Sequence, residues 1–504
     1  MAKAGQRRQQ RVTASLMVTV ALFAASLAAA SPAASASGGG TASDGPGSNA
    51  YWNETLGFQG FATAMSGSSK VWYTLGNGEL ENVFYPQLDQ PNTYGLQFLV
   101  TDGSGFTDTE TANTTHAVAL ADPQSLTFTQ TNAAASGKYT ITKTYVADPA
   151  REVVLINTTF DNKTPTPLSL YVDYQPYLAN QGMGNSGGTD TASGDLVAVN
   201  GSVASALSSS AGFTKTSTGY VGAASNGSGQ LLASHTLTAT YSGTASSGHI
   251  DQTAQIPVAA SGATTFTLAL GFAPNQSAAI SATAASLSAG FAAVEASYES
   301  GWHNWMNGLH AAPASVSGDQ ALLTQYNTAL MELKADEDKT YPGAFVASPA
   351  VPWGGSVSAN SAGAHGYHLV WTRDEYEVAT ALLAAGDTTD ANDALTYLFN
   401  YEEQSNGQVK QNTWLDGNAM WGGNQQDEEA DPIILACQLG RTGSSDFTYM
   451  KPLANWIVSH GPYTQQERWE ENGGYSPSTI AAEVAGLVCA SHIADVNGDS
   501  TDAS

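Results

Sequence analysis

The hydrophobic pattern of this chain changes character near residue 284, and that change constrains the fold more than any other feature. Between about residues 50 and 283, short apolar runs alternate with turns rich in glycine, asparagine, serine and aspartate. More than a dozen runs have period-two or continuous β-branched character, which indicates strands. They predict a large antiparallel β-sandwich over residues 50–283. The clearest runs are KYTITKTYV (138–146), EVVLINTTF (152–160), LSLYVDYQPYL (168–178) and TTFTLALGFA (264–273).

Beyond residue 283 the apolar residues recur every three or four positions, which is the period of a helix. The stripe from Leu287 to Leu309 predicts one long linker helix within residues 284–315, and Ser317 with Gln320 forms a capping box for the next helix. Six helices after residue 316, joined by long polar loops, favour an incomplete α-toroid over residues 316–504 rather than a bundle. The last five helical patterns span 373–386, 390–404, 426–440, 447–460 and 477–494.

The N-terminal segment of the chain predicts its location, and the net charge limits the partners that it could bind. Residues 1–36 have a basic start, an apolar run and an Ala-Ser-Ala site, which is typical of a signal peptide, and residues 37–49 resemble a flexible leader. We see no later run of about eighteen apolar residues, so we expect a secreted protein that is free outside the cell. We also expect it to be a monomer. The net charge of −27 disfavours nucleic acid and membrane surfaces, which leaves a neutral solute or polymer as partner.

Two smaller features bear on stability. Cys437 and Cys489 lie in apolar helical patterns, which favours buried thiols, with a single disulfide as the alternative. Asp495-Val496-Asn497-Gly498-Asp499 begins like a calcium loop, but Ser500 stands at the sixth position, which usually holds glycine. A helix-start turn is therefore favoured there, and a structural calcium ion stays open.

Two loop segments combine tryptophan with polar residues that suit a sugar. In GYHLVWTRDEY, Arg373 and Asp374 could form a helix N-cap with an ion pair, or could grip vicinal hydroxyl groups with paired donors and acceptors. In AMWGGNQQDEE, Trp421 could fill the core beneath its loop, or could stack on the apolar face of a pyranose ring.

A third segment, QQERWEENGGYSP, presents Glu470 and Glu471 beside Trp469, ahead of a helix that Ser476 and Pro477 should open. Adjacent glutamates are common on solvated helix faces. However, glycoside cleavage needs a carboxylic acid that holds its proton, and an aromatic wall with a second carboxylate nearby favours that form. The segment is therefore a candidate for acid catalysis.

Together, and in this order, the three segments resemble the glucoamylase and glucodextranase family, glycoside hydrolase family 15. WYTLGNGELENVFYPQLDQPNTYGLQFLVTDG (72–103) and KADEDKTYPGAFVASPAVPWG (334–354) extend the resemblance. It implies a β-sandwich followed by an (α/α)6 barrel. It also implies an exo-acting, inverting α-glucosidase that releases glucose from the non-reducing ends of α-glucans without a cofactor. Glucodextranase (α-1,6), trehalase and a non-catalytic α-glucan-binding protein are the alternatives.

Carried over by position, the resemblance also implies roles for individual residues. The family's barrel has twelve helices and takes its general base from the second half. We count about six helices and find no residue that matches the base, so we expect this polypeptide alone to be inactive or nearly so. The implied roles are general acid for Glu470, and substrate binding for Tyr367, Arg373, Asp374, Trp421 and Glu471. To these we add Trp469, the indole beside the two glutamates, as a substrate-binding residue.

Overall fold

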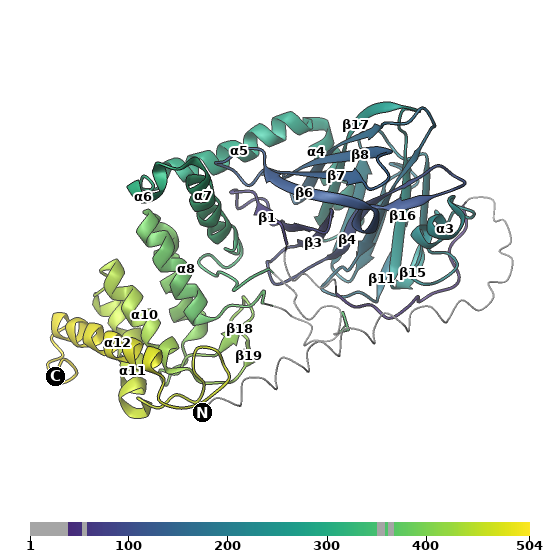
Figure 1. Ribbon diagram of the computed structural model, residues 1–504. Helices are drawn as coiled ribbons and strands as arrows, with labels where there is room; N and C mark the ends of the chain where they lie inside the picture. The colour runs from purple at the N-terminus through teal and green to yellow at the C-terminus, as the bar shows by residue number, and fades with distance from the viewer. Residues whose placement is uncertain (1–38, 53–57, 350–357, 361–366) are drawn as a thin grey trace, which may run out of the picture. The chain divides into compact units, whose positions relative to one another are not determined.

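The computed structural model describes residues 39–52, 58–349, 358–360 and 367–504. The expected signal peptide, and residues 350–354 of the second family-like segment, lie outside the described residues. Two sheets account for the N-terminal half, and helices account for most of the chain after residue 275 (Figure 1).

The first sheet has eight strands in the order β1-β2-β3-β4-β10-β16-β14, with β5 paired to β4, and neighbouring strands are antiparallel. Inward residues such as Leu96, Phe98 and Val172 are fully or almost fully buried. The strands are β1 (Gly60–Thr63), β2 (Trp72–Gly76), β3 (Glu79–Phe84), β4 (Thr93–Thr101), β5 (Thr107–Thr109), β10 (Ser169–Pro176), β14 (Lys215–Tyr220) and β16 (Ile250–Ile256).

The second sheet has nine strands, in the order β15-β11-β12-β13-β17-β9-β8-β7-β6, and shares one apolar core with the first. The expected antiparallel β-sandwich is confirmed. The strands are β6 (Thr114–Leu120), β7 (Phe128–Ala134), β8 (Tyr139–Ala147), β9 (Val153–Asn162), β11 (Asn185–Thr189), β12 (Leu196–Asn200), β13 (Val203–Ser209), β15 (Ala245–Gly248) and β17 (Gly262–Ala273). Two short helices, α2 (Glu110–Asn113) and α3 (Gly227–Ser234), interrupt the strand order.

The linker expected as one helix is broken in two. Helices α4 (Gln276–Ala289) and α5 (Phe291–Gly308) meet at a bend of 93°. Gly290 lies between them with φ +82°, a backbone conformation that glycine adopts readily and that ends an α-helix. The apolar stripe continues across this break, so periodicity alone could not reveal it.

The next helix start also differs from expectation. Ser317 ends the short helix α6 (Ala314–Ser317), and α7 (Gln320–Ala335) is capped by Asp319, whose carboxylate accepts from the amides of Ala321 and Leu322. Aspartate is as good an N-cap residue as serine. Asp319 directly precedes the first residue of α7, whereas Ser317 lies two residues further away. The capping-box prediction was therefore wrong.

The remaining helices fall close to the expected ranges, and their apolar faces form a second core cluster. Ser476 caps the last helix and Pro477 is its first residue, as predicted. The elements are α8 (Thr372–Ala385), α9 (Thr388–Tyr397) continued by a π-turn (Leu398–Glu402), β18 (Asn412–Thr413), β19 (Ala419–Trp421), α10 (Gln426–Leu439), α11 (Ser444–His460) and α12 (Pro477–Val496) (Figure 1).

Helix α12 corrects three expectations. Cys437 on α10 and Cys489 on α12 form a disulfide, so the preference for free thiols was wrong: both are only half-buried and face each other across packed helices. The acidic segment at 495–499 ends α12 rather than starting a helix, with Asn497 as its C-cap. Helix α12 is also long and apolar enough to cross a membrane by length and composition, and 33% of that stretch is buried.

Candidate active site

Glu470 lies in the tight loop between α11 and α12. The loop is closed by Glu467, whose carbonyl oxygen accepts from the Glu470 amide at 2.7 Å. The Glu467 carboxylate accepts from the amides of Trp469 at 3.0 Å and Glu471 at 3.2 Å. Within this loop Glu470 has φ +63°, a left-handed conformation that costs a non-glycine residue on the order of 1–3 kcal/mol. Strain of this kind persists only where the surroundings hold it, and it gathers at functional sites.

The Glu470 carboxylate is held by two donors from other elements. Its Oε1 accepts from the indole Nε1 of Trp371 at 2.7 Å and from the Gln425 amide Nε2 at 3.2 Å. Trp371 is the N-cap of α8, and Gln425 is the N-cap of α10. The carboxyl group is thus fixed by the starts of two helices.

Arg373 connects the same elements. Its Nε donates to the Asp427 carboxylate at 2.9 Å, its Nη1 donates to the Arg468 carbonyl oxygen at 3.2 Å, and its Nη2 donates to the Gln425 side-chain oxygen. Nη2 also lies 3.7 Å from Glu428. Burial disfavours the charged guanidinium, but Glu428 and Asp427 more than offset this and raise the pKa of Arg373. The guanidinium therefore ties the acid-bearing loop to α10.

These residues border a cavity of about 360 Å³. Asp374, in the first turn of α8, lines it as a largely buried carboxyl, and that burial raises its pKa although the neighbouring Arg373 lowers it. The structure places Asp374 inside α8, not at its N-cap, which is Trp371. The lining residues are Ala347, Tyr367, Trp371, Arg373, Asp374, Glu377, Arg468, Trp469 and Glu470.

Aromatic rings surround the carboxyl groups. The rings of Tyr367 and Trp371 lie 6.2 Å apart, and Trp421 on β19 meets Trp371 edge to face at 5.7 Å. Trp469 is 72% exposed at the rim, with the Arg468 guanidinium 5.2 Å from its ring centre. Exposed indole and phenol faces give a pyranose ring an apolar surface on which to stack.

The structure brings most of the predicted residues together. Tyr367, Arg373, Asp374, Trp469 and Glu470 line the cavity, and Trp421 joins through Trp371. Glu471 is exposed and is not among the lining residues.

Sequence reasoning assigned no role to Trp371, Gln425 or Asp427, which hold Glu470 and Arg373. All three stand at or just inside helix starts, and that position was the available signal. Their contacts to Glu470 and Arg373 join segments 45–99 residues apart, which no local pattern encodes.

One cluster of acidic residues has the spacing of a metal site. Oxygen atoms of Glu337, Asp390 and Asp393 lie within 4.8 Å of one another. The ammonium group of Lys334 already pairs with Glu337 and, at 2.6 Å, with Asp390. A cation would have to displace that lysine, so these residues do not suit a metal ion.

Comparisons with known proteins identify the family of this chain. Residues 42–307 match the family model for glucodextranase, domain N, and residues 322–408 and 401–504 match the model for glycosyl hydrolases family 15. A glucoamylase from Clostridium sp. (strain G0005) is 38% identical over 463 residues, covering 91% of this chain and 64% of the relative. The chain thus spans less than two thirds of that relative. A crystal structure of bacterial glucoamylase complexed with acarbose matches with a TM-score of 0.85 at 37% identity, covering 92% of this chain and 67% of that one. The chain belongs to glycosyl hydrolase family 15.

Proposed function

We propose that this chain carries the general-acid side of a glucoamylase-like site, which releases glucose from the non-reducing ends of α-1,4-glucans. The observation that carries the proposal is the Glu470 carboxylate, held by Trp371 and Gln425 at the edge of an aromatic-lined cavity. The relatives named glucoamylase support the substrate class. A substrate end would enter among Tyr367, Trp421 and Trp469.

In the proposed mechanism, Glu470 protonates the glycosidic oxygen as the bond to the anomeric carbon breaks. In the full inverting mechanism a second carboxylate, to which we assign no described residue of this chain, acts as general base. It removes a proton from the water that attacks the opposite face of the sugar, so the configuration inverts. Asp374 accepts hydrogen bonds from sugar hydroxyls. Arg373 has at least three of its five N–H groups engaged by the protein, so its main contribution is to hold the Glu470 loop in place.

We also propose low activity for residues 37–504 assayed alone. Among the described residues we assign a general acid but no general base, and removing such a base typically lowers the rate by about 10²–10⁴. Glucose release from maltotriose should therefore be slow but measurable at high protein concentration. Turnover at ordinary enzyme rates would contradict this part of the proposal.

The role of Glu470 can be tested by the leaving group of the substrate. Fluoride departs without protonation, whereas a sugar alkoxide needs an acid. Glu470→Gln should therefore remove the residual hydrolysis of maltotriose but retain most of the hydrolysis of α-glucosyl fluoride. Glu295→Gln is the control, because Glu295 lies on α5 and is outside the lining set. Equal losses on both substrates would argue against acid catalysis by Glu470.

Stereochemistry and linkage need separate measurements. Proton NMR during turnover should show β-glucose first if the configuration inverts. The match of residues 42–307 to glucodextranase, domain N, favours an α-1,6 activity as the second candidate. Initial rates on maltose, isomaltose and trehalose distinguish the linkages. Starch binding that is lost in Trp421→Ala but unchanged in Glu470→Gln, without any turnover, would instead indicate a binding protein.

The proposed chemistry uses carboxyl groups and water, so we propose that activity survives chelation of divalent ions, with any calcium serving stability alone. Melting with and without EDTA tests that point. We further propose that the protein is exported and acts outside the cell as a monomer. Amino-terminal sequencing of protein from the culture medium should find a start near Ser37.

A further inference from the structure

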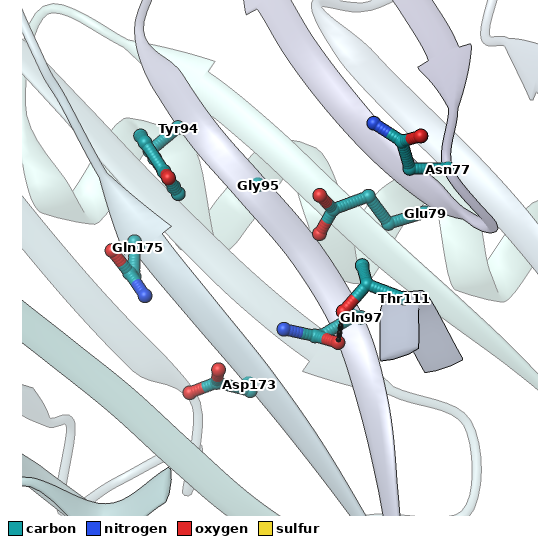
Figure 2. A pocket seen from close by; sticks show the side chains of 8 residues that line it. All are labelled: Asn77, Glu79, Tyr94, Gly95, Gln97, Thr111, Asp173 and Gln175. Atoms are coloured by element: carbon teal, nitrogen blue, oxygen red, sulfur yellow. Dashed lines mark hydrogen bonds between the residues drawn. The ribbon is translucent and has the colours of Figure 1, made fainter. Parts of the chain in front are cut away.

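A second polar pocket lies on the first sheet of the β-sandwich (Figure 2). It encloses about 280 Å³, near the lower end of the range for small-molecule sites. It shares no lining residue with the Glu470 cavity. The lining residues are Asn77, Glu79, Tyr94, Gly95, Gln97, Thr111, Asp173 and Gln175.

Strand register sets the floor of this pocket. Gln97 on β4 stands directly opposite Asp173 on β10, and Gly95 stands opposite Gln175. Residues paired in this way share one face, while the alternate residues enter the core. Glu79 reaches across from β3, and a Cβ at Gly95 would lie only 2.8 Å from its Oε2. Figure 2 shows the Glu79 carboxylate beside Gly95, so this glycine makes room for the acid.

The rim of the pocket is fixed by a buried network. The Gly78 carbonyl oxygen, in the turn after Asn77, accepts from Asn132 at 2.6 Å and from the Lys143 ammonium at 2.8 Å. The Lys143 ammonium also pairs with the Glu110 carboxylate at 2.9 Å, and both side chains are at most 1% exposed. Glu110 directly precedes the lining residue Thr111, so this ion pair fixes that part of the rim. Walls held in this way are formed before a ligand arrives, which lowers the entropic cost of binding.

The buried carboxyl group of Asp173 indicates that this pocket binds a ligand. It is 4% exposed, and its Oδ1 has no hydrogen-bond partner among the described residues. Buried polar atoms nearly always have a partner. The Asp173 carboxyl lies against the Asp251 and Ser228 side chains and also lines the pocket, where a ligand hydroxyl would supply the partner that Oδ1 lacks. Burial, followed by the charges of Asp251 and Glu79, raises the pKa of Asp173.

The lining chemistry selects the class of ligand. No lysine or arginine is among the lining residues, so an anion would find no charge partner there. Carboxyl groups beside the amides of Gln97, Gln175 and Asn77 offer adjacent donors and acceptors, which match neighbouring hydroxyls. Tyr94 is half-buried and adds an aromatic face. We propose that this pocket binds one pyranose ring of a neutral saccharide, as a second sugar site on the sandwich.

The test is calorimetric titration of residues 37–504 with maltotriose, in a Glu470→Gln background that prevents turnover. We expect maltotriose to bind at this pocket, and we expect Gln97→Ala to lower the affinity of that binding at least tenfold. Gln255→Ala is the matched control, since Gln255 is a half-buried glutamine on the same face of the sheet but outside the lining set. Trp421→Ala should leave binding at the sandwich pocket unchanged and weaken any binding in the Glu470 cavity. A failure of this proposal can therefore be told apart from a failure of the proposed function.

Two further variants guard against misfolding and against another ligand. Tyr94→Phe keeps the ring and should retain binding, whereas Tyr94→Ala should lose it, with circular dichroism melts confirming that both are folded. Identical isotherms for Gln97→Ala and Gln255→Ala would overturn the proposal. So would calcium binding that Asp173→Asn abolishes while maltotriose binding at this pocket is undetectable, because that pattern would identify a cation site.

Discussion

The indole Nε1 of Trp371 donates a 2.7 Å hydrogen bond to Oε1 of Glu470, which joins the start of α8 to a loop 99 residues later. The Gln425 amide donates to the same oxygen. The proposed acid is therefore positioned by side chains that do not themselves transfer protons. Its orientation should be sensitive to changes in those side chains.

Trp371→Phe should lower the residual kcat on maltotriose about tenfold and change KM little. The phenyl ring keeps the apolar wall but cannot donate, so the carboxyl group spends less time aimed at the leaving oxygen. Steady-state kinetics check this. Trp456→Phe is the control, since the Trp456 Nε1 has no hydrogen-bond partner among the described residues and its change removes no such bond. An unchanged kcat in Trp371→Phe would show that Gln425 alone suffices.

Arg373 and Asp427 should behave as one unit. Arg373→Lys and Asp427→Asn each break the 2.9 Å contact, so their effects on unfolding free energy should not add. We expect a coupling of about 1–3 kcal/mol in a double-mutant cycle followed by urea unfolding. Additive losses would mean that the carbonyl oxygen of Arg468 and the Gln425 side chain hold the guanidinium without Asp427.

The buried pair of Lys143 and Glu110 should be costly to break on one side. Glu110→Gln leaves an ammonium group in the core, where burial already lowers the pKa of Lys143, and should destabilise the fold by about 3–5 kcal/mol. Replacing both partners, with Lys143→Met and Glu110→Leu, should restore part of the loss. Chemical unfolding gives the free energies. A double variant as unstable as Glu110→Gln would show that the bonds to Phe98 and Gly78 matter more than the charge.

Stability should fall as the pH rises from about 5 to 9. Burial raises the pKa of Glu402 to about 8, despite a hydrogen bond from Thr413. The unfolded chain loses this proton near the ordinary glutamate value of about 4.3. Between those values the unfolded state binds fewer protons than the folded state, so alkali favours unfolding. Glu402→Gln should flatten the dependence of melting temperature on pH. An equally steep curve in the variant would assign the effect to other acids, such as Asp89 and Glu429.

Local patterns in the sequence predicted the elements well where they were strong. The strand runs at 138–146 and 264–273, and the Ser476 cap, appear as expected because period and capping are local properties. The break at Gly290 was missed because the apolar stripe continues across it. The pairing of Cys437 with Cys489 depends on how α10 packs on α12, and helical periodicity does not specify that packing.

The candidate site divides in the same way. Glu470, Arg373 and Asp374 could be chosen from motifs. The donors that hold Glu470 could not, because Gln425 and Trp371 meet it only after three distant segments fold together. The sandwich pocket left no motif either, since it arises from strand register: Gln97 and Asp173 are neighbours across β4 and β10 although they lie far apart in sequence.

The disulfide between Cys437 and Cys489 spans 52 residues, and that covalent ring includes α11 and the whole loop that carries Glu470. A protease that cuts the exposed stretch around Trp469 would therefore release no fragment until the disulfide is reduced. In the presence of proteases, a nicked molecule would keep both halves of the loop that carries Glu470 tethered to helices α10 and α12.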